Sequence, residues 1–335
     1  MSSDPDPQGG LGAATSPVEN DEDIWDVGAV VRGLADARRE WRQANAQHAE
    51  YGSESFPSRT RIGKVVEELS GALFPLRLGP DYVRAHNEDV FITQTLQIAL
   101  SRLHAQLRLE LTYAQGRAEG EEVDPLATRI CMAFSRELPA IRRLLDSDIE
   151  AAFRGDPSAR SLDEVLICFP GMLAIIHHRL AHVLYNLGTP LVARIISEIS
   201  HSRTGIDIHP GARIGRGFFI DHGTGAVIGE TAIIGDNVRI YQGVTLGAKN
   251  FPSDPSGALI KSLPRHPVIE DNVVIYAGAT ILGRVTIGAG SEIGGNVWLT
   301  HDVAPYSRVY QAREQKLVIR SGNDPAAIPQ PEIDA

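Results

Sequence analysis

The fold is decided by a stretch in the second half of the chain, residues 201–247, which reads HSRTGIDIHPGARIGRGFFIDHGTGAVIGETAIIGDNVRIYQGVTLG. From residue 206 onward, aliphatic or small residues recur at every sixth position, and the same step resumes after one interruption. These positions are Ile208, Ile214, Ile220, Ala226, Ala232, Val238 and Val244, then Ile269, Ile275, Ile281, Ile287, Ile293 and Leu299. Neither the 3.6-residue period of a helix nor the two-residue period of a strand produces a step of six, whereas short strands joined by tight corners do. The repeat therefore predicts a parallel β-helix with about 18 residues per coil and coils stacked about 4.8 Å apart.

The rest of the chain divides around this repeat. Residues 1–23 are rich in acids, Gly, Pro and Ser, and we expect a disordered acidic tail because such a composition buries too little apolar area to become ordered. Residues 24–203 are predicted to be α-helical, since leucines at 96, 100, 103, 107 and 111 form one apolar stripe. The β-helix is expected over 204–309, with a loop at 249–264 because 25 residues separate Val244 from Ile269, and residues 310–335 form a C-terminal tail.

Composition narrows the class of protein. The chain has 335 residues, of which 43% are hydrophobic and 22% charged, and it contains no run of 18 apolar residues, so no membrane association is expected. A net charge of −10 disfavours nucleic-acid binding, which needs a basic face. The two cysteines, Cys131 and Cys168, have no CxxC spacing, which favours a cytoplasmic location.

Two ionisable residues, Asp207 and His222, stand where the repeat otherwise contains small and aliphatic side chains. With about 18 residues per coil, Thr204 is expected to lie beneath His222, and Asp207 just across the same corner. A carboxylate that accepts a hydrogen bond from one ring nitrogen leaves the other free to take up a proton near neutral pH. The pair is a candidate general base, although a corner histidine is also commonly structural or solvated.

Both cysteines precede the repeat, so direct transfer in a ternary complex is expected rather than a covalent intermediate.

These residues belong to a recognisable pattern. The run 201–247, followed by Arg265-His266-Pro267 and Ile281-Leu282-Gly283, closely resembles the bacterial serine O-acetyltransferases. The similarity extends back through Arg154-Gly155-Asp156-Pro157 and is greatest to the branch with a longer loop before the Arg-His-Pro motif. The resemblance implies that the β-helix is left-handed. It also implies acetyl transfer from acetyl-CoA to the hydroxyl of L-serine, giving O-acetyl-L-serine in cysteine biosynthesis.

The resemblance also implies a role for each matching position. His222 matches the catalytic base and Asp207 the carboxylate that orients it. The other substrate-binding positions that it implies are Asp156 and Asp221 for the serine amino group, Arg265 and His266 for its carboxylate, and the active-site acid Glu230. The positions that it implies along the coenzyme A slot are Gly247, Ala277 and Gly295. By location alone, the candidate cations for the coenzyme A phosphates are Lys249, Arg313, Lys316 and Arg320. No metal is expected.

The resemblance also implies a homotrimer, or a dimer of trimers, with active sites in the clefts between subunits. It implies L-cysteine as a candidate feedback inhibitor. Several relatives insert a terminal isoleucine into O-acetylserine sulfhydrylase, whereas this sequence ends Glu332-Ile333-Asp334-Ala335, so that complex is not expected.

Three alternatives stay open at this point. The first is a hexapeptide acyltransferase acting on another hydroxyl or amine acceptor. The second is a zinc lyase of the γ-carbonic anhydrase type, which needs about three converging imidazoles; His209, His222 and His266 lack the expected pairing on neighbouring coils. The third is a non-catalytic scaffold that binds a partner enzyme.

Overall fold

The computed structural model describes residues 25–45, 56–115, 122–250, 252–255, 257–261 and 263–311. The predicted acidic tail and residues 312–335 of the predicted C-terminal tail lie outside these described residues. The chain forms two compact units, residues 1–52 and 53–335. The first unit contains helix α1 (Val27–Ala44), which begins where the Asp26 carboxylate accepts a hydrogen bond from the Ala29 N–H at 2.9 Å.

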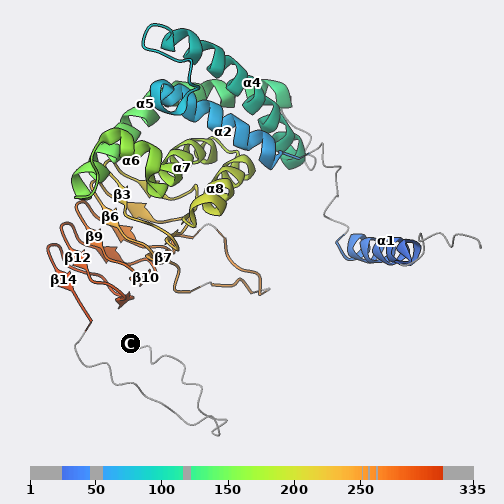
Figure 1. Cartoon of the computed structure of the whole chain (residues 1–335). Coiled ribbons are helices and arrows are strands. Elements are labelled where there is room, and N and C mark those ends of the chain that lie inside the picture. Colours follow the sequence, from blue (N-terminus) through green and yellow to red (C-terminus); the bar gives the residue numbers. More distant parts are fainter. Residues whose placement is uncertain are drawn as a thin grey trace, which may run out of the picture. The chain divides into compact units, whose positions relative to one another are not determined.

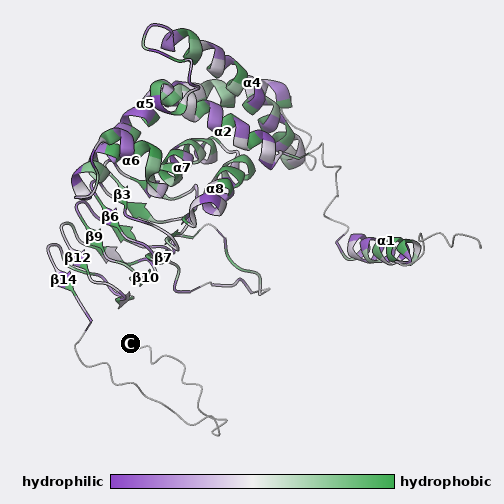
Figure 2. Cartoon of the chain, viewed as in Figure 1, coloured by the Kyte–Doolittle hydropathy of each residue, from purple (hydrophilic) through white to green (hydrophobic). Residues whose placement is uncertain are grey.

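The second unit opens with helices, as the leucine stripe predicts. The described helices are α2 (Arg59–Leu73), α3 (Pro75–Leu78), α4 (Glu88–Gln115), α5 (Val123–Gly155), α6 (Leu162–Cys168), α7 (Pro170–Asn186) and α8 (Pro190–Thr204). Figure 2 shows hydrophobic and hydrophilic bands alternating along α4 and α5, as expected for amphipathic helices. Leu103, Leu107 and Leu111 of α4 are buried in the core, which confirms that the stripe faces inward.

Short parallel strands follow the helices (Figure 1). Sheet A contains β1 (Asp207–Ile208), β4 (Val227–Ile228), β7 (Thr245–Gly247), β10 (Thr280–Leu282) and β13 (Trp298–Leu299). Sheet B contains β2 (Arg213–Ile214), β5 (Ile233–Ile234), β8 (Val268–Ile269) and β11 (Thr286–Ile287). Sheet C contains β3 (Phe219–Ile220), β6 (Arg239–Ile240), β9 (Val274–Ile275), β12 (Glu292–Ile293) and β14 (Arg308–Val309). The chain visits the three sheets in turn, which confirms the predicted fold class of helices followed by a left-handed parallel β-helix.

One coil is longer than the repeat predicts. Strand β1 pairs with β4 so that Asp207 lies beside Val227, 20 residues further along the chain. The strict step of six fails between Ile220 and Ile228, because the corner between these strands holds two extra residues. The sequence conceals this insertion because each coil face places two side chains in the core, two positions apart, such as Ala226 and Ile228. After an insertion of two residues, the first of these positions falls where the step of six expects the second, so the hydrophobic pattern is unbroken. The expected stacking of Thr204 beneath His222 is therefore wrong: the Gly225 N–H donates to the Gly205 carbonyl at 2.7 Å, so Thr204 lies beneath Thr224.

The helices of the second unit and the β-helix share one hydrophobic core. The boundary between the two compact units therefore lies near residue 52, and not near residue 204, where the sequence period changes. A buried ion pair lies where they meet, with Asp148 of α5 contacting Arg179 of α7 at 3.0 Å. The same guanidinium donates to the carbonyls of Ile214 and Gly215, and the Asp148 carboxylate accepts from the Phe218 N–H at 2.9 Å. These contacts fix the helices to the first coil of the β-helix.

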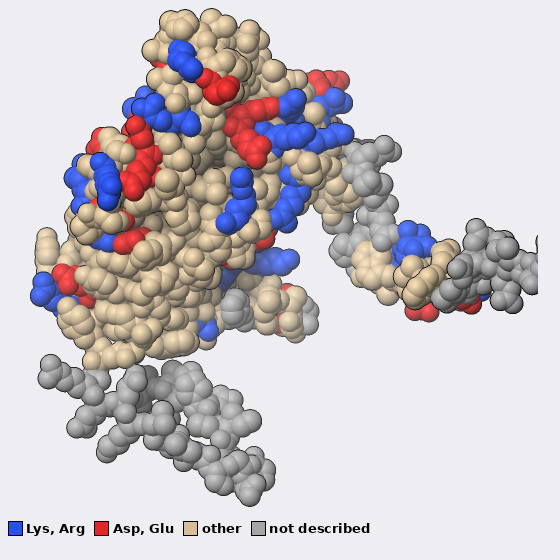
Figure 3. Space-filling view, in the orientation of Figure 1, with Lys and Arg blue, Asp and Glu red and all other residues tan. Residues whose placement is uncertain are grey.

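The described helices are short or polar by the standard of a membrane span. Among them, no single helix has both the length and the apolar composition needed to cross a membrane. The helices α6 and α7 reach that length and composition only when they are counted as one segment, and the chain bends by 76° between them. Figure 3 shows acids and bases interspersed over the helical part of the visible face, while the β-helix below carries few charges there.

Candidate active site

The predicted site residues lie at two edges of the β-helix. We call the corners that lead from sheet C to sheet A the C–A edge, and those that lead from sheet A to sheet B the A–B edge. His222 belongs to the C–A edge, between β3 and β4, whereas Glu230 follows β4 at the A–B edge. Arg265 and His266 precede β8 and also lie at the A–B edge, since both contact Thr231 beside Glu230.

We call the group at the C–A edge the C–A cluster; its members are Asp156, Asp221, His222 and Arg239. His222 has a φ of 58°, and its side chain is 75% exposed. This φ lies in the left-handed region, and Nε2 of the exposed ring lies 3.8 Å from Asp221 Oδ1. The other oxygen of Asp221, Oδ2, accepts a hydrogen bond from Arg239 at 2.5 Å. The corner therefore presents an accessible imidazole with a carboxylate beside it.

Asp156 reaches this cluster from the end of α5. Its backbone caps the helix, and its carboxylate accepts hydrogen bonds from the Ser158 hydroxyl at 2.7 Å and the Ser158 N–H at 2.8 Å. These hydrogen bonds, with smaller contributions from the charges of Arg239 and His222, lower the pKa of Asp156. The hydrogen bonds from Ser158 thus favour the charged form of the Asp156 carboxylate.

We call the group at the A–B edge the A–B cluster; its members are Tyr185, Glu230, Arg265 and His266. The two oxygens of Glu230 are occupied, one by the Tyr185 hydroxyl at 2.8 Å and the other by the Arg265 guanidinium at 2.6 Å. Partial burial raises the pKa of Glu230, but these two hydrogen bonds and the neighbouring positive charges outweigh it and lower the pKa overall. The cluster therefore holds a guanidinium in a fixed place.

His266 is held as a neutral ring. Its Nδ1 accepts a hydrogen bond from the Thr231 N–H at 3.0 Å, so its proton is placed on Nε2. Burial, together with the charge of the neighbouring Arg265, lowers its pKa to about 4. His209 lies in the same electrostatic environment, and burial together with the charge of Arg194 lowers its pKa to about 4 as well.

Asp207 lies at the same edge as the C–A cluster, since its N–H donates to the Ala226 carbonyl at 2.9 Å, but it is not a member of that cluster. It begins β1, and its carboxylate shares a group with Glu198 and His201 in which the potential metal-ligand atoms lie within 4.8 Å of one another. Within the described residues, no hydrogen bond or ion pair joins Asp207 to His222. The metal-ligand group includes none of the three imidazoles weighed for a zinc lyase.

The small residues expected along the coenzyme A slot divide between the two edges. Ala277 and Gly295 continue the C–A edge below His222: the Asn296 N–H donates to the Ala277 carbonyl at 2.9 Å, and a Cβ on Gly295 would come within 3.2 Å of that carbonyl oxygen. Gly247 instead ends β7 at the A–B edge.

Of the cations proposed for the coenzyme A phosphates, one lies among the described residues. Lys249 follows β7 at the A–B edge and lies against Gly283, where an added Cβ would meet the Lys249 Cβ at 3.3 Å. Arg313, Lys316 and Arg320 lie outside the described residues.

The predicted loop at 249–264 contains local pairing in its described part. Ser253 forms an antiparallel bridge with Leu259, and the Ile260 N–H donates to the Pro252 carbonyl at 2.9 Å. The excursion from the coil therefore folds back on itself before the chain returns to the A–B edge at Arg265.

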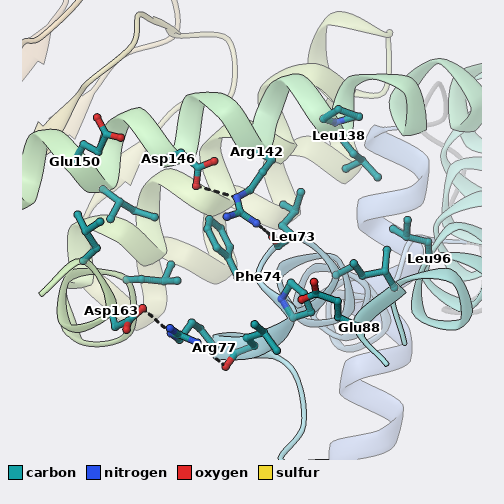
Figure 4. Close-up of a pocket in the computed structure, with 18 residues that line it drawn as sticks. Leu73, Phe74, Arg77, Glu88, Leu96, Leu138, Arg142, Asp146, Glu150 and Asp163 are labelled. Carbon is teal, nitrogen blue, oxygen red and sulfur yellow. Dashed lines mark hydrogen bonds and ion pairs between the residues drawn. The ribbon is translucent and has the colours of Figure 1, made fainter. Parts of the chain in front are cut away.

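A cavity of about 830 Å³ lies elsewhere, in the helical part of the second unit. Figure 4 shows its mixed lining, in which apolar side chains lie beside charged ones, with the ion pairs of Arg77 with Asp163 and of Arg142 with Asp146. It contains none of the predicted site residues. The candidate site is thus formed by open surface at two edges rather than by this cavity.

Two residues of the clusters were missed by the sequence analysis. Arg239 occupies the strand position before an isoleucine that packs on the core, as Arg213 does in β2, so the repeat alone gives no sign of its contact with Asp221. Tyr185 comes from α7, and no local pattern links it to Glu230, 45 residues further along the chain. Only the fold brings these pairs together.

Comparison with known proteins places these features in context. Residues 266–301 match the family model for the bacterial transferase hexapeptide (six repeats). The chain is 55% identical over 272 residues to a plasmid-encoded serine acetyltransferase of Synechococcus elongatus, covering 80% of this chain and 84% of that protein. It is 48% identical to the serine acetyltransferase of Bacillus subtilis over 50% of this chain and 73% of the relative. The crystal structure of serine acetyltransferase isoform 3 from Entamoeba histolytica in complex with cysteine matches with a TM-score of 0.64 and 35% identity, covering 77% of this chain and 84% of that one.

Proposed function

The chain belongs to the serine acetyltransferase family, and from this premise we propose that it transfers the acetyl group of acetyl-CoA to the hydroxyl of L-serine, giving O-acetyl-L-serine. The observation that carries this proposal is the C–A cluster, in which an exposed imidazole lies 3.8 Å from the Asp221 carboxylate, and Arg239 ties Asp221 to the end of α5 that bears Asp156. An acceptor that carries both a hydroxyl and an ammonium group fits this arrangement, because the imidazole can take the hydroxyl proton while the carboxylates hold the amine.

His222 is the proposed general base. It removes the proton from the serine hydroxyl as the oxygen forms a bond to the acetyl carbonyl carbon. The carbon–sulfur bond of the thioester then breaks, and the proton leaves with the thiolate of coenzyme A. No covalent intermediate on the protein is needed, because both substrates are held together in one ternary complex.

Asp207 is the proposed orienting carboxylate, as the family resemblance implies. Support comes from the edge that it shares with His222: Asp207 lies two residues after Gly205, whose carbonyl accepts a hydrogen bond from Gly225 in the His222 corner. Asp221 supplies a second carboxylate at 3.8 Å from the imidazole. We propose that the two carboxylates together stabilise the imidazolium that forms during transfer.

The serine carboxylate is the proposed ligand of Arg265 and His266. The guanidinium offers a planar pair of donors, and the Nε2–H of the neutral His266 ring offers another. In one chain these groups lie at the A–B edge, whereas His222 lies at the C–A edge. We propose that the C–A cluster of one copy meets the A–B cluster of the next in a homotrimer, or in a dimer of trimers, so that each active site lies between two copies.

Acetyl-CoA is proposed to lie along the same cleft. The C–A edge below His222 carries Ala277 and Gly295, whose small side chains leave the backbone accessible to a narrow chain. Gly247 and Lys249 at the A–B edge are the proposed contribution of the neighbouring copy. Arg313, outside the described residues, is retained as a candidate for the coenzyme A phosphates.

L-cysteine is proposed to compete with L-serine, since it has the same amino and carboxylate groups. Support comes from the Entamoeba histolytica enzymes whose structures hold cysteine, isoform 3 and serine acetyltransferase 1. We also propose a cytoplasmic location, where the unpaired Cys131 and Cys168 would stay reduced.

The experiment that tests the function is direct. Purified protein is mixed with acetyl-CoA and L-serine, and loss of the thioester is followed with and without L-cysteine. We expect rapid loss that depends on L-serine and is inhibited by L-cysteine. Loss with a different acceptor but none with L-serine would favour another hexapeptide acyltransferase activity, and no loss with any acceptor would favour a scaffold.

A further inference from the structure

We propose that Arg239 is a positioning residue for the amino-group half of the active site. It holds one oxygen of Asp221 and the end of α5, so that the other oxygen of Asp221 and the carboxylate of Asp156 face the acceptor together. This inference rests on the function proposed above.

The contacts of Arg239 support this role. One arm of its guanidinium, Nη2, donates to Asp221 Oδ2 at 2.5 Å, and the other, Nη1, donates to the Gly155 carbonyl at 2.7 Å. The guanidinium carbon lies 4.8 Å from the centre of the Phe219 ring and 4.6 Å from that of Tyr241. Two hydrogen bonds and two aromatic contacts fix the plane of the side chain, which is 24% exposed.

These contacts determine which oxygen of Asp221 is free. Because Oδ2 is bound to Arg239, Oδ1 is the oxygen that faces His222, at 3.8 Å from Nε2. An ammonium group that binds Oδ1 is therefore placed beside the imidazole that takes the hydroxyl proton. Without Arg239, the Asp221 carboxylate could rotate about its side chain and would lose this orientation.

The second contact places Asp156. Gly155 directly precedes Asp156, so the hydrogen bond from Arg239 to the Gly155 carbonyl holds the end of α5 against β6. A side chain on Gly155 would prevent this approach, since its Cβ would lie 2.8 Å from the Phe219 ring. One guanidinium thus links the two carboxylates, one from a helix and one from the β-helix.

An arginine is better suited than a lysine to this position. The planar guanidinium reaches a carboxylate and a carbonyl in two directions while it stacks on aromatic rings, whereas an ammonium group cannot stack in that way. We therefore expect Arg239→Lys to recover only part of the function lost in Arg239→Gln.

The test compares Arg239→Gln and Arg239→Lys with a matched control, Arg308→Gln. Arg308 occupies the same ladder of sheet C as Arg239 and contacts Glu292 at 3.3 Å, but its side chain is 68% exposed. We expect Arg239→Gln to raise the KM for L-serine by about 10- to 100-fold, from the loss of a hydrogen bond between charged groups, and to leave the KM for acetyl-CoA unchanged. Arg308→Gln should change neither constant. Equal changes in both KM values, or no change in either, would overturn the proposal.

A double-mutant cycle separates positioning from general stability. If Arg239 acts through Asp221, then Arg239→Gln should add little to the loss already caused by Asp221→Asn. Full additivity would contradict the proposal, and Arg239→Lys provides the same comparison should Arg239→Gln fail to fold. A wild-type protein that does not acetylate L-serine overturns the proposed function and this inference together, whereas an active wild type with an unaffected Arg239→Gln overturns this inference alone.

Discussion

The two edges of the β-helix hold their charged groups in different ways. At the C–A edge, the His222 side chain is 75% exposed, and its Nε2 lies 3.8 Å from Asp221 Oδ1, which is longer than a hydrogen bond. At the A–B edge, both oxygens of Glu230 are hydrogen-bonded, and His266 is buried. The first arrangement leaves groups available to react, while the second fixes a cation before any ligand binds. We propose that this difference reflects a division of labour, with proton transfer and amine binding at one edge and anion binding at the other.

The largest expected effect is at the reactive edge. Replacing His222 with alanine should lower kcat by about 10²- to 10⁴-fold, since the proposed general base is lost. Thioester consumption with L-serine measures the change, and His86→Ala, at an exposed site in the helical region, is the control. Near-normal turnover in His222→Ala would remove this residue from the role of base.

A smaller loss is expected at the anion-binding edge. Arg265→Gln should lower kcat/KM for L-serine by about 10- to 100-fold, because a charge-assisted interaction with the carboxylate is lost. The matched control is Arg216→Gln, an exposed arginine at the third edge of the β-helix, between β2 and β3. Equal behaviour of the two variants would argue against anion binding at Arg265.

The A–B edge should also respond to acid. His209 and His266 have pKa values of about 4 in the folded protein because of burial and neighbouring arginines, against an ordinary value of 6.5. At these two histidines, and at His177, whose pKa burial also lowers to about 4, the unfolded state binds more protons below pH 6.5. Their contribution to the stability should therefore fall as the pH decreases from about 6.5 to 4, against a smaller opposite contribution from the buried Asp148, whose pKa is raised to about 6. Urea unfolding at a series of pH values checks this, and His209→Asn should reduce the slope. A stability that is independent of pH across this interval would contradict it.

The smallest effect is expected from the hydroxyl that holds Glu230. Tyr185→Phe removes one hydrogen bond of 2.8 Å, worth about 1 kcal/mol, and should lower kcat/KM for L-serine by about fivefold. Tyr82→Phe, at a residue that is 61% exposed, serves as the control. A loss as large as that of Arg265→Gln would show that the hydroxyl does more than hold the carboxylate.

Much of the fold could be predicted from the sequence, because the repeat is regular apart from one corner and the leucine stripe of α4 is regular. The two extra residues at the His222 corner could not, since each strand buries two positions and a shift of two keeps the hydrophobic pattern intact. Asp148 and Arg179 illustrate the same limit, because their ion pair depends on how the helices pack on the first coil.

The candidate site was predicted in part. The resemblance implied one site for these residues, and the structure places His222 beside Asp221 and Arg265 beside Glu230, while their roles stay predictions. The sequence did not reveal that these form two groups at different edges, because that depends on which sheets each corner joins. Arg239 and Tyr185 were missed because their partners are distant in the sequence or belong to another element.

The central claim is that each active site combines the C–A edge of one copy with the A–B edge of another. The most direct test is to co-express His222→Ala with Arg265→Gln and to assay the mixed oligomers at low L-serine. If the claim is right, random mixing in a trimer leaves one intact site in each mixed oligomer, so activity should return to about a quarter of the wild-type value. Activity no greater than the average of the two variants assayed alone would contradict it.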